Sequence, residues 1–172
     1  MFDSARGYIS VLGTAFILAA CATQAAPLNL AGDYAVPRDS GIITNARPAG
    51  PADCPSPDQY VEGQDMCIEP TAVTDTLTLT PQDNGDLAFN IFTNAFNGHS
   101  CSAEGVARQT GAQSWRFERQ SEYGEGICKV DITVKGGSVH FQQDYEAGSD
   151  CRDYCGNRAS LGGTFPLSSQ QP

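Results

Sequence analysis

Six of the seven cysteines have the number and spacing of a disulfide framework. They are Cys54, Cys67, Cys101, Cys128, Cys151 and Cys155. An even set of widely spaced cysteines favours disulfide bonds in an exported chain. A zinc site would instead need closely paired cysteines or clustered histidines, and the sequence has only two histidines. We therefore expect three bridges, no metal site and no cofactor.

The stretch 97–101 is the one most similar to a catalytic sequence. His99 lies two residues before Cys101, and a Cys–His pair can form an activated nucleophile. A disulfide at Cys101 would remove that thiolate, so we predict no catalytic residue. His99 and His140 could share a metal with carboxylates, but they fall on separate predicted strands. We interpret both as surface histidines.

Acidic side chains are the other candidates for chemistry. The chain has 20 acidic and 10 basic residues and a net charge of −10, which argues against binding nucleic acid. Seven carboxylates fall near the predicted turns at one end of the fold: Glu118, Glu122, Glu125, Asp144, Glu146, Asp150 and Asp153. Paired carboxylates can hydrolyse glycosides, so a hydrolase using these residues or His99 is one alternative. Solvated charges at turns are the simpler interpretation of these seven residues, and an acidic face that docks a basic protein is a further one.

The seventh cysteine, Cys21, follows an apolar run from 9 to 20. That run is too short to span a bilayer and is typical of a signal peptide. Leu18-Ala19-Ala20-Cys21 resembles the bacterial lipobox, which implies cleavage before Cys21 and attachment of lipid to its thiol. We predict a signal peptide at 1–20 and a tether at 21–31; an ordinary secretory signal cleaved after Ala26 is the alternative. Ala22 is similar to the residue that follows the cysteine in outer-membrane lipoproteins, which implies an anchor in the outer membrane facing the periplasm.

Strand-like alternation dominates the remaining chain. It predicts strands at 33–36, 76–80, 87–91, 99–108, 115–119, 127–134, 139–145 and 159–167. Asn84-Gly85 between two alternating runs is a strong hairpin signal, and it would place Leu77, Leu79, Leu87, Phe89 and Ile91 on one face. We predict a single all-β domain at 32–168, an antiparallel meander of seven or eight strands that closes into a barrel. A β-sandwich is the alternative.

Two similar segments suggest how the barrel closes. Residues 30–34 and 161–165 share a pattern of small residues followed by an aromatic residue. We predict that the first and last strands are neighbours.

Residues 37–70 contain six prolines. We predict one long loop there, held by a bridge between Cys54 and Cys67. The turn at 135–138 pairs Val134 with Val139 and therefore places Cys128 opposite Tyr145, and the Gly111 turn places Cys101 at the same rim. We favour Cys128–Cys151 and Cys101–Cys155; the alternative is Cys101–Cys128 with Cys151–Cys155.

The stretch 151–159, Cys-Arg-Asp-Tyr-Cys-Gly-Asn-Arg-Ala, resembles a C-x-x-Y-C-G-x-R-A signature of small exported proteobacterial proteins. The whole plan, an acidic, disulfide-bonded, lipid-anchored barrel, is similar in architecture to lysozyme-inhibitor lipoproteins and to barrel inhibitors of secreted proteases. This resemblance implies a non-enzymatic envelope binding protein, in one version an inhibitor of a cationic hydrolase such as lysozyme. A structural or assembly lipoprotein is the third possibility.

Overall fold

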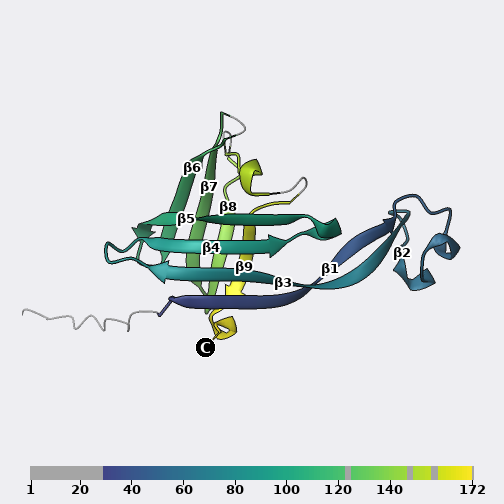
Figure 1. Cartoon of the computed structure of the whole chain (residues 1–172), viewed down its shortest axis with the longest axis horizontal. Coiled ribbons are helices and arrows are strands. Elements are labelled where there is room, and N and C mark those ends of the chain that lie inside the picture. Colours follow the sequence, from purple (N-terminus) through teal and green to yellow (C-terminus); the bar gives the residue numbers. More distant parts are fainter. Residues whose placement is uncertain (1–28, 123–124, 147–148, 156–158, 172) are drawn as a thin grey trace, which may run out of the picture.

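The computed structural model describes residues 29–122, 125–146, 149–155 and 159–171, and these form an all-β fold in which short 3-10 turns are the only helical elements (Figure 1). The elements are β1 (Gly32–Asn45), η1 (Pro51–Asp53), η2 (Pro57–Gln59), β2 (Tyr60–Val61), β3 (Met66–Pro81), β4 (Leu87–Asn94), η3 (Phe96–Gly98), β5 (Ser100–Gly111), β6 (Ser114–Gln120), β7 (Ile127–Lys135), β8 (Ser138–Gln143), η4 (Arg152–Tyr154), β9 (Gly162–Pro166) and η5 (Leu167–Ser169). The strand order β1-β3-β4-β5-β6-β7-β8-β9, antiparallel throughout, makes a nearly closed eight-stranded barrel. The predicted meander and barrel are confirmed.

The meander bends sharply between β5 and β6. These strands pair only beside their connecting turn, from Arg108↔Arg116 to Gly111↔Ser114. Figure 1 shows that β3, β4 and β5 run across the view while β6, β7 and β8 run steeply to them. The two halves therefore cover each other's apolar face, as an amphipathic sheet requires.

Aromatic side chains fill the barrel interior. Phe89 packs edge-on against Phe117 at 5.2 Å and against Phe141 at 5.3 Å between ring centroids, and Phe141 packs against Phe165 at 6.5 Å. Such pairs contribute about 0.5–1.5 kcal/mol each beyond simple burial. The predicted hairpin face is confirmed, because its five residues are all buried: Leu77, Leu79, Leu87, Phe89 and Ile91.

The first and last described segments meet at the barrel seam, although β9 does not pair with β1. The chain leaves β9 through η5, and Gln170 then forms a bridge with Tyr34. The Gln171 amide donates to the Asp33 carbonyl at 2.7 Å. The two ends of the sheet are therefore close together, as predicted, but the residues that pair with β1 follow β9 and do not belong to it.

Leu30 belongs to the folded domain, although we predicted it in the tether. Its side chain is buried in the core, and the Tyr34 hydroxyl donates to its carbonyl at 3.0 Å. The domain therefore begins before residue 32 and continues past residue 168. Cys21, the signal peptide and most of the tether lie outside the described residues.

The prediction of a loop over 37–70 is wrong at both of its ends. β1 and β3 continue there as a paired ribbon, from Pro37↔Thr74 to Ile43↔Ile68, and this ribbon projects from the barrel at the right of Figure 1. We call residues 37–74 the arm. Its irregular part, between the two strands, contains η1, η2 and β2.

Proline is compatible with the arm because the arm has two free edges. The Ile43 amide points away from β3, since it donates to Asn97 Oδ1 at 3.0 Å. Pro37 lies six residues earlier, so its nitrogen also faces the outer edge of β1. Pro70 pairs with Gly41 in the same register and its nitrogen faces the outer edge of β3. Neither proline breaks a ladder hydrogen bond.

Candidate functional site

Three disulfides join Cys54 to Cys67, Cys101 to Cys155, and Cys128 to Cys151. These are the pairings that the sequence favoured. The hairpin register behind that choice also holds, because Val134 pairs with Val139. Two of the bridges lie at one end of the barrel and the third lies in the arm.

The chain that follows β8 closes one end of the barrel. It first runs along β7, where the Asp150 amide donates to the Ile127 carbonyl at 3.0 Å. It then crosses to β5, where Cys155 bridges to Cys101. The Tyr154 ring packs on Phe117 at 6.1 Å, and burial raises the pKa of its hydroxyl. This segment covers the end of the barrel and is held there by a disulfide. The barrel interior is therefore a packed hydrophobic core.

Several of the seven predicted rim carboxylates hold this crossing and its neighbouring loops. Asp150 binds Arg152 with a closest distance of 2.6 Å, and this hydrogen bonding lowers the pKa of Asp150 to about 2. Asp153 accepts from the Ser121 hydroxyl at 3.0 Å and from the Glu122 amide at 2.6 Å. Glu122 pairs with Arg119 at 3.0 Å. These contacts give Asp150, Asp153 and Glu122 a structural role, while Glu118 and Glu125 are exposed.

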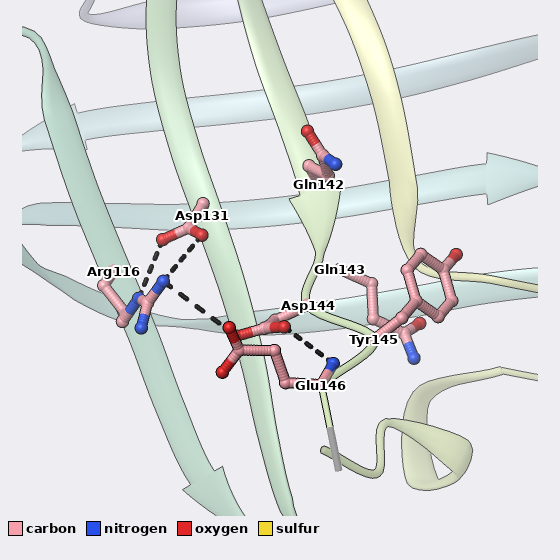
Figure 2. Close-up of a pocket in the computed structure, with 7 residues that line it drawn as sticks. All are labelled: Arg116, Asp131, Gln142, Gln143, Asp144, Tyr145 and Glu146. Carbon is pink, nitrogen blue, oxygen red and sulfur yellow. Dashed lines mark hydrogen bonds and ion pairs between the residues drawn. The ribbon is translucent and has the colours of Figure 1, made fainter.

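A polar hollow lies on the outer face of β6, β7 and β8 (Figure 2). Arg116 on β6 donates from Nε and Nη2 to the two oxygens of Asp131 on β7, both at 2.8 Å. Asp144 Oδ2 lies 4.0 Å from Nη2, and its other oxygen accepts from the Glu146 amide at 2.8 Å. The hydrogen bonds to Asp131 raise the pKa of Arg116 further. Asp144 and Glu146 were predicted as rim residues, whereas Arg116, Asp131 and Tyr145 were not.

The two histidines and Cys101 are not among the residues that line this hollow. Cys101 is buried in its disulfide. His140 lies with Nδ1 at 3.2 Å from the Thr164 hydroxyl and Nε2 at 3.2 Å from the Lys135 carbonyl. Among the described residues, no three His, Cys, Asp or Glu side chains lie close enough together to hold a metal ion.

The arm is fixed to the barrel through one buried carboxylate, Asp75. Its Oδ2 accepts from Arg38 Nε at 2.6 Å, and its Oδ1 accepts from the Asn94 amide at 2.7 Å. Asp75 is only 8% exposed, and Asn94 ends β4. The carboxylate therefore ties the three strands together at the point where β1 and β3 leave the barrel. Nothing in its sequence neighbourhood distinguishes it from the other acidic residues.

The outer part of the arm is strongly acidic. Residues 46–69 contain one arginine, Arg47, and five carboxylates: Asp53, Asp58, Glu62, Asp65 and Glu69. Asp53 accepts from the Ala49 amide at 2.7 Å and Asp65 from the Tyr60 hydroxyl at 2.8 Å, which raises the pKa of Tyr60. A hydrogen bond from Ser56 lowers the pKa of Asp58. Local contacts thus order the tip and leave it negatively charged.

Comparisons of the chain with protein-family models, curated proteins and solved structures give no match. In the described part of the chain, no helix has both the length and the apolar character needed to cross a bilayer.

Proposed function

We propose that this chain is a lipid-anchored protein of the bacterial envelope that binds a basic protein partner, in one version a cationic hydrolase such as lysozyme, which it inhibits. The observation that carries the proposal is the arm: it projects from the barrel, it is tied by its own disulfide, and its outer part carries five carboxylates against one guanidinium.

An arm of this construction suits docking because it is ordered before it meets a partner. The Cys54–Cys67 bridge closes a separation of 13 residues, and Asp75 fixes the base. Little conformational freedom is then lost on binding, which favours affinity. A concentrated negative charge also speeds encounter with a basic protein and makes the association dependent on salt.

The described chain begins at residue 29 and enters β1 at one end, and the arm tip follows the other end of that strand. A 14-residue strand spans about 45 Å. A lipid on Cys21 would therefore hold the barrel at the membrane surface and leave the acidic tip well above it.

The test uses immobilised lysozyme and the protein purified from the periplasm with its bridges formed. We expect retention at low salt that falls as salt is raised. Glu62→Lys with Glu69→Lys should weaken retention about tenfold or more, through like-charge repulsion. The matched control carries the same charge change on the barrel, as Glu104→Lys with Glu118→Lys, and should weaken it far less.

Two outcomes would count against the proposal. Lack of lysozyme retention at low salt would remove the lysozyme-inhibitor version. Equal weakening by the arm variant and the barrel variant would show that net charge, and not the arm, determines binding. The anchor has its own test: Cys21→Ser should release the protein from the membrane fraction and abolish labelling by palmitate.

A further inference from the structure

A groove crosses the outer face of β6 to β9, away from the arm. It consists of two hollows of about 490 and 310 Å³. They share three lining residues, Gln142, Gln143 and Tyr145, so the two shallow hollows adjoin, and we refer to them together as the groove. The first hollow extends over Arg116 and the second over β9, where Gly162, Gly163 and Thr164 line it.

Tyr145 stands between the two hollows. Its side chain is 70% exposed, and Figure 2 shows its ring on the β9 side, across the hollow from Arg116. Tyrosine offers a large, rigid, amphipathic contact surface and loses little side-chain entropy on binding. An exposed ring inside a groove is therefore suited to cover one face of a ligand.

Planar polar groups line the same hollow as this ring (Figure 2) and keep free hydrogen-bonding capacity. Gln143 Oε1 accepts from the Leu161 amide at 3.1 Å, which orients its amide group. Arg116 is held through Nε and Nη2 by Asp131, so Nη1 remains available to a ligand. Within the described chain, the side chains of Gln142 and Glu146 have no hydrogen-bond partner. The groove thus combines two polar groups oriented by hydrogen bonds, Gln143 and Arg116, with two whose donors and acceptors are unused, Gln142 and Glu146.

The chemistry of the groove selects one class of ligand. An extended peptide could not add to its floor, because β8 is already paired with both β7 and β9. The polar lining does not suit an apolar ligand, and the net charge of −10 opposes nucleic acid. A sugar ring has an apolar face that can stack on tyrosine and a rim of hydroxyl groups that can bond with planar amides, carboxylates and guanidinium.

We propose that this groove is a binding site for a neutral oligosaccharide, with Tyr145 as the stacking platform and Gln142, Gln143 and Arg116 as hydroxyl-binding groups. The site uses no part of the arm and is independent of the docking of a basic protein.

The experiment is calorimetric titration of the periplasmic protein with three neutral tetrasaccharides: cellotetraose, maltotetraose and the β-1,4-linked tetramer of N-acetylglucosamine. We expect at least one to bind. Tyr145→Ala should weaken that binding about tenfold, whereas Tyr145→Phe, which keeps the ring, should change it by less than about threefold. Gln142→Ala should weaken it by about threefold or more.

The matched control is Phe92→Ala, which removes an exposed aromatic residue on β4, outside the groove, and should leave the affinity unchanged. The proposal is overturned if none of the three tetrasaccharides binds the wild-type protein, or if Tyr145→Ala and Phe92→Ala bind equally well. It is also overturned if Tyr145→Ala leaves sugar binding intact and instead weakens lysozyme retention, since the groove would then be a protein-docking surface.

Discussion

The barrel and the arm share two strands, β1 and β3, but different interactions stabilise each part. Within the barrel, alternate side chains of these strands enter a closed aromatic core, and the end of the barrel is tied by two disulfides. Within the arm the ribbon has no second sheet to cover it. Its order depends on one disulfide, on backbone pairing and on the Asp75 contacts. The difference separates a part that supplies stability from a part that is free to make contacts.

The largest effect should come from the centre of the barrel. Phe89→Ala removes a ring that packs against two others, and we expect the free energy of unfolding to fall by about 3–5 kcal/mol. Urea denaturation followed by tryptophan fluorescence measures this, since Trp115 lies in the core. Phe96→Ala, an exposed ring beside the arm, is the control and should change stability by less than about 0.5 kcal/mol.

The bridge from β5 to the crossing segment should rank second. Cys101→Ser with Cys155→Ser opens a link between residues 54 apart and should lower the free energy of unfolding by about 2–4 kcal/mol. If the double variant unfolds at the same urea concentration as the wild type, the crossing segment is not part of the cooperative barrel.

The base of the arm should give an intermediate effect. Asp75→Asn keeps the shape of the side chain but loses the ion pair with Arg38, and we expect a cost of about 1–2 kcal/mol. Hydrogen exchange should accelerate most at Val73 and Thr74, next to the substituted residue. Asp39→Asn removes an exposed carboxylate of the same ribbon and should leave both measurements unchanged.

The disulfide of the arm should affect the barrel least. Cys54→Ser with Cys67→Ser should change the barrel's urea midpoint by less than the equivalent of about 0.5 kcal/mol, because the bridge constrains a segment outside the core. The arm should nevertheless become sensitive to limited proteolysis between residues 46 and 65. A fall as large as that of the Cys101–Cys155 pair would contradict the division into two regions.

The ion pair at the barrel end gives a small, pH-dependent effect. Hydrogen bonds from Arg152 lower the Asp150 pKa to about 2 from its usual value of 3.8. The contribution of this pair to stability is therefore complete above pH 4 and disappears as the pH falls towards 2. An NMR titration of the Asp150 carboxyl should show this midpoint. Asp150→Asn should remove that part of the acid dependence and lower stability at pH 7 only slightly, because the Arg152 side chain is 78% exposed and solvent screens the pair.

The barrel could be predicted from the sequence because its determinants are local. Alternation over five residues places Leu77 and Leu79 inside the barrel. A tight turn fixes Val134 opposite Val139. This hairpin register was sufficient to place Cys128 near Cys151. The arm could not be predicted in this way. Whether Pro37 breaks a strand depends on which edge of that strand is free, and this is a property of the assembled sheet.

The candidate sites show the same limit. Arg116, Asp131 and Tyr145 meet only because β6, β7 and the end of β8 lie in a particular register. The strands themselves were predicted, but the sequence that connects β6 to β7 contains two glycines and is compatible with several registers. A search for outward-facing polar residues on three adjacent strands would have found the set once that register was known.

The free edges of the arm have a consequence for the behaviour of the protein at high concentration. β2 pairs with the start of β3, and Asn97 binds the Ile43 amide on the outer edge of β1. Elsewhere the outer edges of the projecting ribbon have no paired strand among the described residues, and such edges are a common starting point for edge-to-edge aggregation. Pro37 interrupts the donors on one side and Pro70 those on the other. With one proline on each edge, neighbouring molecules cannot extend a continuous sheet through their arms, so the arms are protected from edge-to-edge pairing at high concentration.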